Sequence, residues 1–245
     1  MDIRAFICGV ILTAVWVAPA YALRPFDGTD ASVAGPGELE LEMGYLSYLR
    51  EGEQKSVTAP SAVINFGLEN GNELVLEGRV RNRLHPDHDT RRTTFEDAAL
   101  SVKHVHRNGV LQERAGPSIA GECGVLFPTL RGDRTGAACT GIVSERWGQA
   151  TFHFNGAVGK NREGNWERFL GAIVAGPSFG AVRPVLETFF VRDSGGLRTD
   201  SALAGLIWTV NESLAFDLGL RKARNEAFGV TEIRAGFTWN RPIHH

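Results

Sequence analysis

The stretch Glu38–Tyr45 reads Glu-Leu-Glu-Leu-Glu-Met-Gly-Tyr, so that charged and apolar side chains alternate almost one by one. A period of two is typical of a β-strand with one polar and one apolar face. The same alternation recurs along the chain, for example at Asp97–Lys103, Leu214–Arg221 and Glu232–Trp239. Because no window carries a sustained period of 3.6 residues, the chain is predicted to be all-β.

Twelve candidate strands follow from this pattern, and most have about ten residues, which is long for a soluble sandwich and suited to a tilted strand that crosses a bilayer. Twelve such strands also exceed the eight of a soluble lipocalin-like barrel, whose faces would be inverted. We therefore predict a closed, antiparallel, up-and-down transmembrane β-barrel. The predicted strands are 37–49, 56–67, 73–82, 93–106, 117–127, 138–147, 150–160, 167–175, 183–193, 200–210, 214–223 and 230–240.

The connections between these strands alternate in character. Tight turns are expected at 69–72, 148–149 and 211–213, whereas longer, charged loops are expected at 83–92, 128–136, 161–165 and 194–199. Outer-membrane barrels show this asymmetry, with short periplasmic turns and longer outer loops. The connection 107–115 is long for a periplasmic turn and fits the scheme least well.

The first residues are typical of an export signal. Arg4 precedes the apolar run Ala5–Val17, and small residues at Ala20 and Ala22 form a cleavage site. The run is shorter than the roughly 20 residues of a spanning helix, so a signal peptide over 1–22 is preferred to a membrane anchor. We expect a periplasmic N-terminal segment at 23–36, whose turn Asp27–Asp30 would be placed to plug the periplasmic mouth, and the barrel at 37–245.

Composition narrows the function classes further. The chain has 245 residues with 26 Lys and Arg against 28 Asp and Glu, and this lack of a basic excess argues against a nucleic-acid partner. After the signal, no run of 18 apolar residues remains, so only a closed barrel would span a bilayer.

In such a barrel the apolar face meets lipid and the polar face lines the lumen. Charges of both signs in a low-dielectric lumen are expected to pair. The pairs would either form a transverse field in an open pore or pack as a polar core that seals the barrel, and a selective binding site is a third, less favoured reading. The predicted lumen-lining residues are Glu40, Glu42, Glu77, Arg79, Arg81, Asp97, Lys103, Glu122, Arg146, Glu187, Asp217, Arg221, Glu232 and Arg234.

Three residues invite a catalytic interpretation. Ser144 and His153 would lie opposite each other across a tight turn, with Asn155 two residues farther on. Serine, histidine and an orienting amide serve nucleophilic hydrolysis, as in outer-membrane phospholipases. Because alternation places these side chains in the lumen and not on the lipid face, we prefer a hydrogen-bonded lumen histidine and predict no catalytic residues and no enzyme activity.

Two further sets of side chains are candidates for chemistry. Cys123 and Cys139 flank a loop and would face each other, so that either a cross-strand disulfide in an oxidising compartment or two free thiols facing lipid are possible. His85 and His88 lie in a charged loop with Asp87 and Asp89, and imidazole and carboxylate groups at this spacing could bind a divalent metal ion. Such a loop is usually just solvated, and we prefer this interpretation. We therefore expect neither a metal nor a cofactor.

Several stretches resemble one family. Leu23–Ala31 (Leu-Arg-Pro-Phe-Asp-Gly-Thr-Asp-Ala), Gly37–Glu42, Gly116–Ala120 and Thr231–Gly236 are similar to the outer-membrane proteins grouped under the MetA-pathway of phenol degradation. The resemblance implies a barrel in the outer membrane that passes small, aromatic or apolar molecules. It supplies no catalytic residues.

These observations lead to a functional expectation. The chain is expected to be a passive transporter or channel for an unidentified small solute, located in the outer membrane after signal-dependent export. Its expected partners are outer-membrane lipid and, during insertion, the barrel-assembly machinery. The alternatives are a sealed barrel with a structural role in the envelope and, less favoured, a lipid-modifying hydrolase.

Overall fold

The computed structural model describes residues 24–243, except 87–90, 131 and 227. The expected signal peptide at 1–22 lies outside the described residues. Asp87, His88 and Asp89, which belong to the loop with candidate metal ligands, also lie outside them. Within the described part of the chain, no helix has the length and apolar character needed to cross a membrane.

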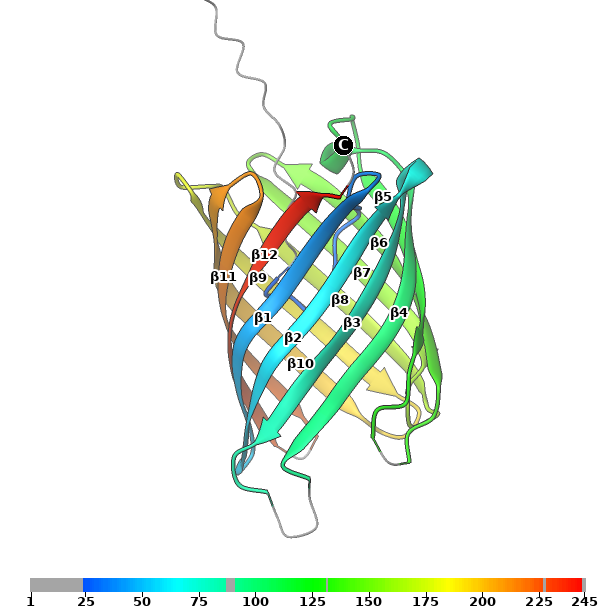
Figure 1. Ribbon diagram of the computed structural model, residues 1–245, viewed down its shortest axis with the longest axis vertical. Helices are drawn as coiled ribbons and strands as arrows, with labels where there is room; N and C mark the ends of the chain where they lie inside the picture. Colours follow the sequence, from blue (N-terminus) through cyan, green and yellow to red (C-terminus); the bar gives the residue numbers. More distant parts are fainter. Residues whose placement is uncertain (1–23, 87–90, 131, 227, 244–245) are drawn as a thin grey trace, which may run out of the picture.

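Twelve antiparallel strands form a closed barrel in which every strand pairs with its neighbours in the sequence and β1 pairs with β12 (Figure 1). This confirms the predicted fold, and each predicted strand boundary lies within two residues of the observed one. The strands are β1 (Glu38–Glu51), β2 (Gln54–Leu68), β3 (Asn72–Arg83), β4 (Thr93–Arg107), β5 (Ser118–Leu126), β6 (Gly136–Trp147), β7 (Ala150–Lys160), β8 (Trp166–Ala175), β9 (Val182–Asp193), β10 (Arg198–Asn211), β11 (Leu214–Asn225) and β12 (Gly229–Pro242).

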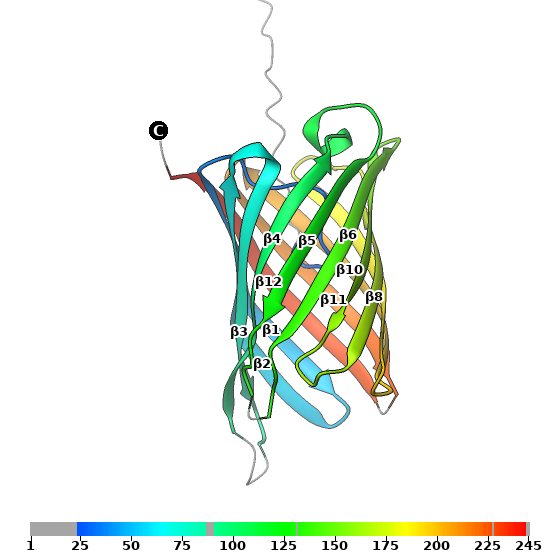
Figure 2. The ribbon, with the colours of Figure 1, turned by 90° about the vertical axis from the view of Figure 1, so that its right-hand side faces the viewer.

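The two ends of the barrel differ. At one end, which we name the terminal end, Glu38 at the start of β1 pairs with Pro242 at the end of β12. Two short 3-10 helices, η1 (Glu69–Gly71) and η2 (Val110–Gln112), belong to connections at this end. The opposite end, which we name the loop end, carries the connections between β3 and β4, β5 and β6, and β7 and β8 (Figures 1 and 2).

The polarity of the barrel wall is the reverse of that of a soluble protein. Large apolar side chains such as Leu170, Leu186 and Leu218 are exposed on the outer face, while charged side chains such as Glu187 and Asp217 are buried on the inner face. Alternation along each strand produces both faces at once, because successive side chains point to opposite sides of a sheet. An outer face of this kind fits hydrocarbon, and an inner face of this kind fits a polar lumen.

β-Bulges interrupt the alternation on β1, β2, β4 and β10. On β1 a register shift between Gly44 and Leu46 leaves Tyr45 and Leu46 both exposed, and the inward positions resume at Ser47. Because a bulge adds one residue, every following side chain of that strand points to the opposite face from the one that strict alternation predicts. Strict alternation therefore assigns the correct face only up to each bulge.

Candidate functional site

Residues 24–36, which we name the N-terminal segment, lie inside the lumen and cross it before the chain enters β1 (Figure 2). The segment has no regular secondary structure, and its polar backbone groups bond to side chains of the barrel wall instead. Buried backbone amides need such partners. The bonds run from the amides of Asp27 and Gly28 to Glu187, from Thr29 to Asn155, from Ala31 to Ser144 and from Ala34 to Glu73, with N···O distances between 2.6 and 3.0 Å.

Glu187 of β9 makes the most concentrated of these contacts. Both of its carboxylate oxygens lie 3.0 Å from the amide nitrogen of Asp27, and one of them lies 2.7 Å from that of Gly28. The residue is only 4% exposed. Hydrogen bonds from amides to an ionised carboxylate are stronger than neutral ones, so Glu187 is a main anchor of the segment.

Charged pairs fix the beginning of the segment. The guanidinium of Arg24 lies 3.3 Å from the carboxylate of Asp217 on β11. Arg234 of β12 donates to the carbonyl oxygen of Pro25 at 2.7 Å and forms an ion pair with Asp27 at 3.0 Å. Arg234 also pairs with Glu232 at 2.9 Å. This network joins the segment to the last two strands of the barrel.

Glycines on the inner wall make room for the segment. Gly205 of β10 and Gly219 of β11 are cross-strand partners beneath Pro25. A Cβ atom at position 219 would lie 2.9 Å from Cγ of that proline, which is closer than real Cβ contacts. The wall and the segment are therefore complementary in shape as well as in hydrogen bonding.

Ser144 and His153 are cross-strand partners, with 2.8 Å between the serine Oγ and the histidine Nδ1. The side chain of Ser144 is fully buried, and its oxygen accepts the amide hydrogen of Ala31. Asn155 holds the segment with both ends of its amide, accepting from the Thr29 amide and donating to the Thr29 carbonyl oxygen at 2.8 Å. Ser144 and Asn155 thus anchor the segment, His153 bonds Ser144, and the serine hydroxyl is buried.

A cavity of about 330 Å³ lies between the segment and the inner faces of β1 to β8. Its walls are strongly acidic, and Lys103 is the one basic residue that lines it. The ammonium of Lys103 lies 3.1 Å from Oγ1 of Thr29 and 3.7 Å from Oδ1 of Asp30. The acidic lining residues are Asp27, Asp30, Glu40, Glu42, Glu73, Glu77 and Glu122.

Toward the loop end, arginines and carboxylates form compact ion pairs. Arg79 pairs with Asp97, and Arg81 of the same strand lies 2.9 Å from Glu96 and 3.1 Å from Glu51. The backbone of Asp97 adopts a positive φ of 58° at a bulge of β4. The bulge lets Glu96 and Asp97, which are adjacent in sequence, both reach arginines of β3.

The predicted lumen residues fall on the inner side of the strands, with Asp97 at the β4 bulge. Arg221, Glu232 and Arg234 are brought together, as are Arg79 and Asp97. Arg146 lies exposed near the end of β6, away from these groups.

The alternating pattern alone does not predict several residues that line the lumen or hold the N-terminal segment. Glu73 belongs to the same alternation as Glu77, so its signal was present, whereas Glu96 is inward only because of the bulge. Arg24 and Asp30 lie in a segment without periodicity, and no pattern indicates their contacts.

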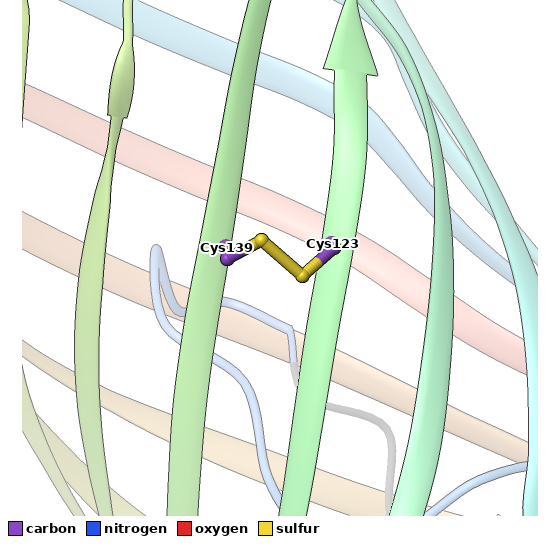
Figure 3. The surroundings of a disulfide bond; sticks show 2 residues. All are labelled: Cys123 and Cys139. Carbon is purple, nitrogen blue, oxygen red and sulfur yellow. A yellow bond between two sulfur atoms is a disulfide. The ribbon is translucent and has the colours of Figure 1, made fainter.

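Cys123 of β5 and Cys139 of β6 form a disulfide bond (Figure 3). They are direct cross-strand partners, and both are exposed on the outer face of the barrel. The bond thus joins two strands that are already paired. Among the described residues, no group of three or more His, Cys, Asp or Glu side chains is arranged to hold a metal ion.

No protein-family model matches the chain, and no curated protein matches its sequence. Solved structures do match its fold. The COG4313 outer membrane channel from Pseudomonas putida F1 is similar with a TM-score of 0.60 and 10% identity, over 88% of this chain and 99% of that chain. The KdgM porin, whose structure in complex with disordered oligogalacturonate is known, is similar with a TM-score of 0.54 and 8% identity, over 82% of this chain and 98% of that chain. At such identities the likeness concerns the fold.

Proposed function

We propose that this chain is an outer-membrane β-barrel that acts as a passive channel for small molecules. The observation that carries the proposal is the reversed polarity of a closed barrel. Exposed leucines and phenylalanines cover the outer face, while buried carboxylates, arginines and a lysine line the lumen. Hydrocarbon accepts the first surface and water accepts the second. Similarity of fold to an outer membrane channel and a porin supports the same proposal.

In this proposal the N-terminal segment limits passage. It occupies the lumen and leaves a cavity of about 330 Å³ on one side, so that a solute passes beside the segment or displaces it. Selectivity then arises from the charged groups of the wall and of the segment itself. Diffusion down a gradient supplies the driving force.

A sealed barrel with a structural role is the second candidate, and one observation favours it. Carboxylate, amide and hydroxyl side chains of four strands hold the backbone of the segment across the lumen. The structure gives no support to a lipid-modifying hydrolase, because the hydroxyl of Ser144 is buried beneath the segment.

We further propose that the barrel lies in the outer membrane, contacts its lipid and belongs to the MetA-pathway family. The apolar outer face supports outer-membrane lipid as a partner, and export through the signal at 1–22 would lead to the barrel-assembly machinery. The stretches Leu23–Ala31 and Thr231–Gly236 support membership of the MetA-pathway family. That membership would favour solutes with an aromatic or apolar part.

Single-channel conductance of the refolded mature chain in a planar bilayer tests the proposal. A heat-dependent shift in gel mobility first verifies that the barrel has folded. We expect discrete current steps in the wild type and larger or more frequent steps in Glu187→Ala, because this substitution removes an anchor of the segment. Glu69→Ala, an exposed change at the turn before β3, serves as the control.

The two candidate functions give different results in this experiment. A channel conducts in the wild type and responds to the loss of Glu187 but not to the loss of Glu69. A folded barrel without current steps in any of the three proteins would refute the channel and support the sealed barrel.

A further inference from the structure

The cavity beside the N-terminal segment has an unusual balance of charge. Seven carboxylates and one ammonium line it. The ammonium belongs to Lys103, which is 4% exposed and has Glu73 and Glu122 as its cross-strand partners on either side. Together with Arg234, which pairs with Asp27, two cations face seven carboxyl groups.

Carboxylates elsewhere in the lumen are treated differently. Asp217 has Arg24 as a partner, and Glu232 has both Arg221 and Arg234. Arginine thus pairs with the buried acids of β11 and β12, whereas Glu187 of β9 accepts from backbone amides. Of the seven cavity carboxylates, only Asp27 has an arginine partner among the described residues, Arg234 at 3.0 Å.

Three cavity carboxylates are short of partners. Among the described residues, Glu77 and Glu122 have neither a hydrogen bond nor an ion pair within 4 Å; Glu77 is exposed and Glu122 is half-buried. Asp30 is only 1% exposed, and its Oδ2 atom is buried without a hydrogen-bond partner. A buried polar atom without a partner costs free energy and calls for an explanation. A cationic ligand in the cavity would supply the missing partners.

The arrangement selects among cations. These carboxylates are spread around a cavity of about 330 Å³, and no described group is clustered tightly enough to hold a bare metal ion. Apolar side chains, among them Val63, Val75 and Phe169, form other parts of the wall. A ligand with separated positive charges on an alkyl body matches both features, and the aromatic ring adds a surface that favours ammonium groups. The volume lies at the lower end of the range for small-molecule sites.

We propose that the cavity binds small organic polycations, namely alkyl diamines and polyamines, between the N-terminal segment and the acidic inner faces of β1, β3 and β5. The proposal rests on the proposed function, since it names the solute class for which the lumen is built. It refines the expectation of an apolar solute by adding positive charge at both ends of the apolar body.

Equilibrium binding tests the site without depending on transport. Isothermal titration calorimetry of the refolded mature chain in detergent would use 1,4-diaminobutane and spermidine as ligands. The comparison solutes are 1,4-butanediol, which has the same length without charge, succinate, which has the opposite charge, and magnesium chloride. We expect heat of binding for the two amines only, and weaker binding as salt is added, because screening reduces the attraction.

Paired variants assign the binding to the cavity. Glu77→Gln/Glu122→Gln removes two unpaired carboxylates from the cavity, and we expect it to weaken diamine binding about tenfold or more. Glu69→Gln/Glu212→Gln removes the same charge from exposed turns at the terminal end and should leave binding unchanged. The heat-dependent gel shift verifies that both variants are folded.

The results separate this inference from the proposed function. Absence of amine binding, equal binding of magnesium, or equal loss in both double variants would overturn the inference. Current steps without amine binding would leave the channel standing and remove the polycation site. Amine binding that depends on Glu77 and Glu122, in a barrel that never conducts, would support the site and refute the channel.

Discussion

Removing the carboxylate of Glu187 tests whether the N-terminal segment is held as the structure describes. In Glu187→Ala the amides of Asp27 and Gly28 lose the acceptors that lie 2.7 and 3.0 Å away. Hydrogen bonds to a charged group contribute about 1.5–3 kcal/mol each. The pair therefore contributes roughly 3–6 kcal/mol, and water that enters the vacated space offsets part of it. We take a net loss of about 3 kcal/mol, which is roughly a 150-fold change in the ratio of docked to undocked segment.

Hydrogen exchange followed by mass spectrometry measures this ratio. A peptide that covers residues 24–36 reports the opening of the segment, and peptides from the strands report the barrel. We expect amide protection in the segment to fall by about two orders of magnitude in Glu187→Ala, with little change in the strands. Glu69→Ala should behave as the wild type. Equal protection of the segment in Glu187→Ala and the wild type would show that the carboxylate does not hold it.

Three further substitutions probe other features of the barrel. Gly219→Val should overpack the wall beneath the segment at a cost of about 1–3 kcal/mol and loosen the segment in the same exchange experiment. Gly141→Val should not, because a Cβ on this outer-face residue would meet only the carbonyl oxygen of Gly156, at the ordinary contact distance of 3.9 Å. Cys123→Ala/Cys139→Ala should lower the temperature of the heat-dependent gel shift by an amount equivalent to at most about 3 kcal/mol, and reductant should affect only the wild type. Ser144→Ala should destabilise the docked segment by about 1–3 kcal/mol, measured by the same exchange, without changing the hydrolysis of nitrophenyl esters, and a loss of esterase activity would contradict the anchoring role.

The sequence predicts the barrel well because one physical rule produces it. Each strand must present apolar atoms to one side and polar atoms to the other, and the period of two makes this visible at Glu38–Tyr45 and again in the later strands. The same rule places Glu187, Asp217 and Glu232 on the inner wall. Bulges break the rule, so strict alternation cannot place Glu96 on the inner wall.

The segment is where prediction from sequence fails. Residues 24–36 have no periodicity, because side chains of β3, β6, β7, β9 and β12 hold their backbone and no paired strand does. The partners of Ala34 and Pro25 lie 39 and 209 residues away. A local pattern cannot encode contacts at such separations. The acidic cavity is hidden for the same reason, since the segment forms one of its walls.

The position of this segment in the chain has a consequence for assembly. The segment in the lumen is synthesised before the strands that bind it, and one of its partners, Arg234, lies in the last strand. The segment can lie on the concave side of the growing sheet until β12 meets β1. If the sheet closes first, the segment has to thread through one of the two open ends. The N-terminal segment is thus synthesised first but completes its contacts last. Its full set of contacts can form only after β12 has been added to the barrel.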